Sequence, residues 1–89
     1  MQQIYAIIDD VAGEIGPVVS MRHDAVATRM FADLINQPNG AMAKHPQDYR
    51  LLRLGTIDEV GNITPEIKEI LTGSALVAAS QTPNLEITK

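Results

Sequence analysis

The sequence predicts a small α+β domain: a mostly antiparallel sheet of about four strands with one amphipathic helix packed on one face. Three observations lead to this class: an N-terminal run of β-branched and aromatic residues, one strongly periodic helical segment, and a later pair of strand-like segments around a turn. A chain of 89 residues is long enough for one domain and too short for two. We expect residues 1–79 to form that domain and residues 80–89 to form a flexible C-terminal tail.

A first hairpin is predicted over residues 3–21. Residues 3–8 (Gln-Ile-Tyr-Ala-Ile-Ile) favour a strand, and Asp9 and Asp10 end it. Residues 12–17 are rich in glycine and end in Pro17, which is typical of a long connection, and an extended pattern resumes at residues 18–21. Because proline has no backbone N–H, we expect Pro17 in an edge strand or at a strand end.

One amphipathic helix is predicted over about residues 24–36. Asp24 is a good N-cap residue, and Asn36 and residues 38–40 (Pro-Asn-Gly) end the pattern. We expect Phe31 to be a core anchor rather than an exposed stacking residue. The apolar side chains that share the helical face are Val26, Met30, Phe31, Leu34 and Ile35.

A loop of about 12 residues and a second hairpin are expected next. Residues 37–48 are read as the loop, near the upper length limit for a structureless connection. Residues 49–54 then alternate in part and are read as a strand. We expect Tyr49, Leu51 and Arg53 on one face of it, and Arg50, Leu52 and Leu54 on the other. Residues 58–62 favour a turn, after which Ile63 begins the return strand.

The C-terminal third leaves two alternatives open. Residues 64–66 (Thr-Pro-Glu) resemble a helix start, and the apolar residues after them fit a helical face. Residues 72–74 (Thr-Gly-Ser) interrupt this pattern, and residues 75–79 could form a last strand. We narrowly prefer an extended segment for residues 75–79.

Composition excludes several classes of protein. There is no cysteine, so disulfides, thiolate metal sites and a cysteine nucleophile are excluded. No apolar run approaches the ~18–20 residues of a membrane span. The net charge of −4 argues against a protein that binds nucleic acid mainly by neutralising its phosphates. Residues 20–55 nevertheless carry five Lys or Arg against three Asp. A mildly basic centre therefore lies between acidic flanks.

Catalytic and metal sites are not predicted. The carboxylates at residues 9–14 and at Asp58 and Glu59 lie at turns, where Asp is common for backbone reasons. His23 and His45 lack the spacing of a zinc site, and the serines lack a nucleophile elbow. We expect a protein without enzymatic activity, cofactor or metal; an orphan hydrolase, with carboxylates converging in a pocket, is a weaker third possibility.

Single-stranded nucleic acid is the remaining chemical candidate. Non-specific single-strand binders combine cations with aromatic faces, and residues 44–53 offer both. The alternative is that the tyrosines complete a core that is short of large side chains. The predicted contacts are Lys44, Tyr49, Arg50 and Arg53, supported by Arg22, Arg29 and Tyr5.

An ordered set of short motifs resembles a known phage family. The motifs are Ile-Ile-Asp-Asp-Val-Ala-Gly (7–13) with Gly16-Pro17, Asp-Ala-Val-Ala-Thr-Arg (24–29) with Phe31 and Asn36, Lys-His-Pro-Gln-Asp-Tyr (44–49), and Leu-Leu-Arg-Leu-Gly (51–55) with Asp58 and Gly61. Over residues 4–63 the chain resembles the small non-structural protein of gokushovirus-type microviruses, which are single-stranded DNA phages. The resemblance implies a role outside the mature capsid, in the host cytoplasm, with DNA binding suspected in single-strand synthesis or packaging.

Two functional hypotheses follow. The first is a non-enzymatic phage protein that acts in genome replication or packaging by weak, salt-sensitive binding of single-stranded DNA. The second is a protein-interaction module that binds a host or phage replication protein through its acidic flanks. Under either, a thin core and open sheet edges lead us to expect a homodimer, formed through strand pairing or the C-terminal segment.

Overall fold

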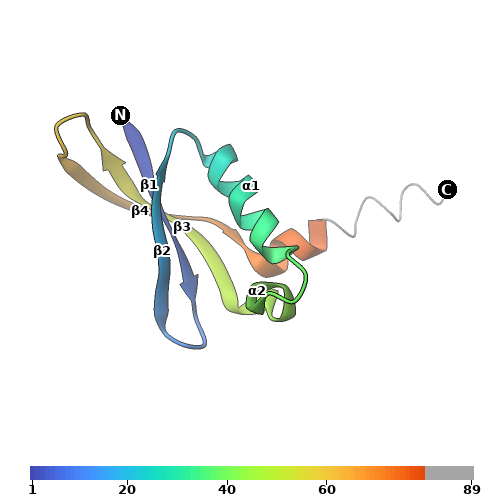
Figure 1. The fold of residues 1–89 in the computed structure, drawn as a ribbon. Helices are drawn as coiled ribbons and strands as arrows, with labels where there is room; N and C mark the ends of the chain where they lie inside the picture. The colour runs from blue at the N-terminus through green and yellow to red at the C-terminus, as the bar shows by residue number, and fades with distance from the viewer. Residues whose placement is uncertain (80–89) are drawn as a thin grey trace.

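A four-stranded antiparallel sheet with helices on one face forms the fold (Figure 1). The computed structural model describes residues 1–79, so the predicted tail at residues 80–89 lies outside the described part. The predicted fold class is confirmed. In the sheet the strands lie in the order β2-β1-β3-β4. The elements are β1 (Gln2–Asp9), β2 (Glu14–Met21), α1 (Asp24–Ile35), α2 (Ala41–Lys44), the 3-10 helix η1 (Pro46–Asp48), β3 (Tyr49–Ile57) and β4 (Ile63–Thr72), followed by helical residues 73–79.

The first hairpin is tighter than predicted. Its turn covers only residues 10–13, where the Asp9 carboxylate accepts the N–H groups of Val11 and Ala12, each at 3.1 Å. β2 therefore begins at Glu14, inside the segment that was read as a long connection. Its register shifts between residues 15 and 18, and Pro17 lies in that irregular stretch. Because β2 is an outer strand, the prediction for Pro17 is confirmed.

α1 packs its apolar face on the sheet. Ala27, Phe31 and Ile35 are buried there against side chains of β1 and β3, so Phe31 is the predicted core anchor. The prediction of Asp24 as N-cap is wrong. His23 occupies that position without a side-chain cap, because the Asp24 carboxylate, in the first turn, bonds to side chains of the sheet instead.

Residues 37–48 are not a structureless loop, since they contain α2 and η1. This segment lies against the turn of the first hairpin and against the backbone that follows β4. The Asp10 N–H donates to the Asp48 carbonyl oxygen at 2.8 Å. A Cβ added to Gly73 would lie 1.9 Å from the Pro46 carbonyl oxygen, so the backbone after β4 passes directly against η1.

The structure settles the alternatives that the sequence left open in the C-terminal third, and the narrow preference for an extended segment at residues 75–79 is wrong. Residues 64–66 lie in β4 rather than at a helix start, because β4 pairs along β3 as an outer strand, where Pro65 is tolerated. Residues 75–79 are helical rather than extended. The Thr72 hydroxyl accepts the Ala75 N–H at 3.0 Å, as an N-cap side chain does, and so starts this helix.

Candidate functional site

The side chain of Arg53 is bound inside the fold. Its Nη1 lies 3.0 and 2.9 Å from the two carboxylate oxygens of Asp24, and the Tyr5 hydroxyl donates to the same carboxylate at 2.5 Å. Only 18% of the Arg53 side chain is exposed. The Tyr5 hydrogen bond, followed by Arg53, holds the pKa of Asp24 below its ordinary value. This cluster ties α1 to β1 and β3.

Tyr5 offers no free ring to a base, and Tyr49 packs partly against the core. Tyr5 is 0% exposed, so its prediction as a stacking residue is wrong; burial and the hydrogen bond to Asp24 raise its pKa to about 12. Tyr49 is half-buried against the core, and burial, with Asp9 nearby, raises the pKa of its hydroxyl. Tyr5 thus completes the core, as the alternative drawn from the sequence expected, and the stacking role of Tyr49 stays a prediction.

Arg50 is also held by carboxylates, on the other side of the sheet. Its Nε lies 2.9 Å from Asp10 Oδ2, and its Nη1 lies 3.3 Å from Glu69 Oε1. Both partners raise the pKa of the Arg50 guanidinium. Arg53 faces α1, whereas Arg50, three residues earlier, faces away from it, as the strand alternation predicts. Arg50 and Arg53 therefore do not form one cationic surface.

The remaining predicted cations are exposed but lie on different elements. Arg22 precedes α1, Arg29 lies on α1 and Lys44 ends α2. Within residues 1–79, none of the three takes part in an ion pair. Of the seven predicted DNA contacts, these three alone combine exposure with an uncompensated charge in the described part of the chain.

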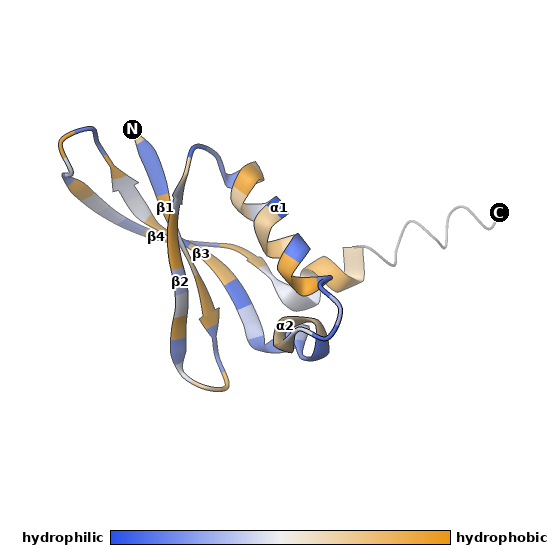
Figure 2. Ribbon diagram, in the orientation of Figure 1, coloured by the Kyte–Doolittle hydropathy of each residue, from blue (hydrophilic) through white to orange (hydrophobic). Residues whose placement is uncertain are grey.

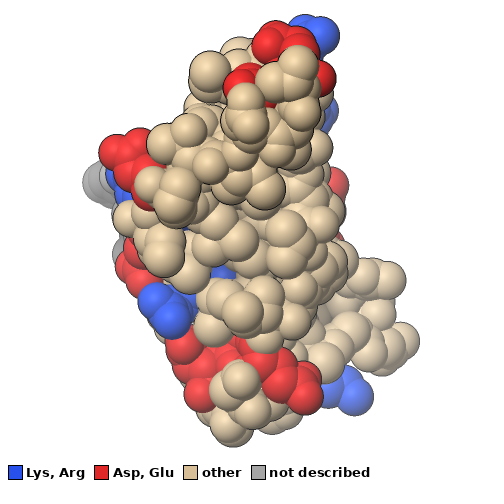
Figure 3. All heavy atoms as spheres, turned by 90° about the vertical axis from the view of Figure 1, so that its left-hand side faces the viewer, with Lys and Arg blue, Asp and Glu red and all other residues tan. Residues whose placement is uncertain are grey.

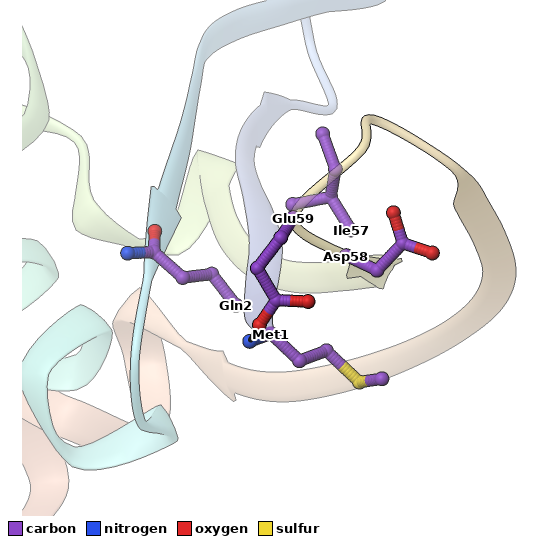
Figure 4. Close-up of a pocket in the computed structure, with 5 residues that line it drawn as sticks. All are labelled: Met1, Gln2, Ile57, Asp58 and Glu59. Carbon is purple, nitrogen blue, oxygen red and sulfur yellow. Dashed lines mark hydrogen bonds and ion pairs between the residues drawn. The ribbon is translucent and has the colours of Figure 1, made fainter.

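The acidic turns have structural explanations. Asp58 accepts the N–H groups of Val60 and Asn62 at 3.0 and 2.9 Å, and Asn62 is the main cause of the lowered pKa of Asp58. Glu59 pairs with the N-terminal amine at 3.0 Å. Both carboxylates line a shallow pocket of about 240 Å³ beside the start of β1 (Figure 4). No group of His, Asp and Glu among residues 1–79 is arranged to hold a metal ion.

The most unusual surface is the sheet face opposite α1, here called the open face. The register and alternation of the strands place nine aliphatic side chains on it: Ile4, Ala6, Ile8, Ile15, Val18, Leu52, Ile57, Ile63 and Ile67. In Figure 1 the described helices all lie on the other side of the sheet. Ile15, Val18, Ile63 and Ile67 are 68%, 57%, 61% and 73% exposed. The open face is thus a solvent-exposed apolar surface.

Most charged side chains lie around the open face, and the two that the register places on it, Arg50 and Glu69, are paired with each other. Figure 3 looks onto this side of the molecule, and its middle shows almost only uncharged side chains, with Asp, Glu, Lys and Arg toward the ends and the left margin. Figure 2 shows hydrophobic residues along the sheet strands as well as on α1. Exposed apolar patches of this kind mark interaction sites on soluble proteins.

Sequence reasoning missed the open face, although a signal for it was present. Residues 4–8 of β1 are hydrophobic without a break, and β3 carries Leu52 on the side away from Leu51. A strand with one solvated face alternates apolar and polar residues, so this pattern indicates two covered faces. The role of Asp24 also escaped prediction, because it depends on contacts 19 and 29 residues away.

The comparisons identify the family. No helix in residues 1–79 has the length and hydrophobicity to cross a bilayer. Neither a curated protein nor a solved structure matches the chain. The family model described as "Phage ORF5 protein" matches residues 2–77, which span the whole sheet and the start of the last helix. The chain therefore belongs to the Phage ORF5 protein family.

Proposed function

We propose that the chain is a non-enzymatic phage protein that acts in genome replication or packaging by binding protein through its open face. We place it in the host cytoplasm of an infection by a gokushovirus-type microvirus, the group that its sequence resembles. The family match supports the phage origin. The open face carries the proposal, because large aliphatic side chains up to 73% exposed suit a protein surface and cannot neutralise phosphate.

Single-stranded DNA binding is the second candidate. The observation in its favour is the exposure of Arg22, Arg29 and Lys44, none of which is ion-paired within residues 1–79. Against it stand the net charge of −4 and the carboxylate partners of Arg50 and Arg53. Any such binding would be weak and salt-sensitive.

Complementation of a phage that lacks this gene separates the two candidates. The host would supply the wild-type chain, Ile67→Lys on the open face, or a triple variant with Arg22, Arg29 and Lys44 changed to Gln. The readout is the yield of single-stranded genomes and of packaged particles. We expect Ile67→Lys to lower the yield at least tenfold and the triple variant to support a near wild-type yield.

Val26→Lys is the matched control. Val26 lies on α1 and is 43% exposed, so the same lysine is introduced away from the open face. Full complementation by Ile67→Lys would overturn the proposal. Loss of yield in the triple variant alone would replace it with the DNA-binding candidate.

A further inference from the structure

The open face has the apolar composition of a sheet face that is covered by a second layer. β1 presents Tyr5 and Ile7 to α1, and presents Ile4 and Ile8 to the other side. Ala6, between them on the open face, is only 1% exposed, because larger neighbours already surround it. A sheet whose inner strands are apolar on both faces normally has a layer packed on each. In residues 1–79 only the α1 side has one.

The edges of the sheet are poorly suited to self-association. β2 and β4 are the outer strands, and each contains a proline, Pro17 and Pro65. A proline removes one N–H from the ladder that a further strand would need, and it is a common means of protecting an edge. Strand pairing between copies, one of the two routes that we expected from the sequence, is therefore disfavoured, whereas the open face offers apolar surface for self-association.

We propose that the open face binds the open face of a second copy, so that two sheets pack face to face in a homodimer. This inference rests on the proposed function and names the partner at the same surface. Strands of eight residues and a width of four strands give a face of about 27 Å by about 19 Å, or roughly 500 Å² per copy. Two copies then bury roughly 1,000 Å² even as flat surfaces, which is at the lower size limit for a specific interface.

The charges of the open face suit an identical partner. Arg50 at one end of the face is already compensated by Asp10 and Glu69 of its own chain. No partner of opposite charge is needed there, and a twofold axis brings apolar surface against apolar surface. Stacked sheets of this kind pack about 10 Å apart with strands within about 30° of each other. The homodimer would thus supply the second layer that the small core lacks.

Sedimentation equilibrium of the full chain tests the homodimer. The expected mass is twice the monomer mass of 9.7 kDa. Ile15→Lys and Ile67→Lys place a charge on the open face at opposite outer strands, and each is expected to raise the dissociation constant of the dimer on the order of tenfold or more. Both side chains are largely exposed in the monomer, so the variants should fold, which circular dichroism checks. Val26→Lys, on α1, should leave the mass unchanged.

Other outcomes overturn the homodimer or the proposed function, and they can be told apart. A wild-type chain that stays monomeric refutes it directly, and so does a dimer that survives both isoleucine variants. Dissociation by only one of them indicates contact along one edge and refutes the face-to-face arrangement. If the wild type is monomeric while Ile67→Lys still fails in complementation, the homodimer is wrong and the proposed function stands with another protein on the open face. If Ile67→Lys dissociates the dimer yet complements fully, the proposed function is the part that fails.

Discussion

Replacing Arg53 with alanine should lower stability, because Arg53 is part of the fold rather than of a DNA site. The substitution removes two hydrogen bonds of 3.0 and 2.9 Å to the Asp24 carboxylate. A hydrogen bond to a charged group contributes about 1.5–3 kcal/mol. Asp24 is 38% exposed, so solvent screening reduces this, and we expect a loss of about 1–2 kcal/mol in the free energy of unfolding. In a chain of this size that lowers Tm by roughly 5–15 °C.

Arg50→Ala is the matched control for Arg53→Ala. Its carboxylate partners are 45% and 49% exposed, and exposed ion pairs add little to stability. Urea denaturation followed by circular dichroism measures both variants. Equal losses for the two arginines would show that the cluster around Asp24 does not stabilise the domain as described.

The loss caused by Arg53→Ala should also depend on pH. The pKa of Asp24 is lower in the folded chain than its ordinary value of 3.8. The stability that this carboxylate contributes is therefore present above about pH 4 and is lost as the pH falls through its folded pKa. The difference between wild type and Arg53→Ala should shrink from about pH 7 to about pH 2. A difference that stays constant over this range would refute the role given to the ionised carboxylate.

Three further variants test other parts of the structure. Tyr5→Phe removes the hydroxyl that is the largest cause of the low pKa of Asp24, so the pKa of Asp24 should rise, as ¹³C NMR titration would record. The pKa of Tyr5 is raised from its ordinary value of 10.0 to about 12 in the folded chain, so the wild type should lose stability as the pH rises from 10.0 to about 12. Tyr5→Phe should reduce this loss at alkaline pH. Gly55→Ala places a Cβ 2.1 Å from the Thr64 carbonyl oxygen at a φ of 156° and should lower the free energy of unfolding by more than about 3 kcal/mol. Gly61→Ala, at a φ of 94° with no atom near the added Cβ, should lower it by about 1 kcal/mol. Thermal unfolding measures both variants.

Local sequence pattern predicted the elements whose signals are strong and near in sequence. The period of the apolar residues after Asp24 identified α1, and the β-branched run of residues 3–8 identified β1. The pattern left residues 64–66 open between a helix start and a strand, and pairing of β4 with β3 along an outer strand decides for the strand. It failed for Asp24, a good cap by residue type, because two partners in the sheet compete for its carboxylate.

The candidate site was less predictable than the fold, because it depends on which charges meet across the sheet. Arg50 and Arg53 are close in sequence, but the alternation of β3 sends them to opposite faces and to different carboxylates. Net charge along the chain could not reveal this pairing. The open face was readable in principle, since residues 4–8 are hydrophobic without a break, but only the three-dimensional structure shows that the described helices all lie on one side (Figure 1).

Titration of a labelled single-stranded oligonucleotide with the full chain, at low and at moderate salt, tests most directly whether this protein acts through protein contacts rather than phosphate. We predict no binding in the micromolar range at either salt concentration, because the guanidinium groups of β3 are held by the carboxylates of their own chain. Tight binding that weakens as salt rises, and that is lost in Arg50→Ala and in a folded Arg53→Ala, would contradict the account.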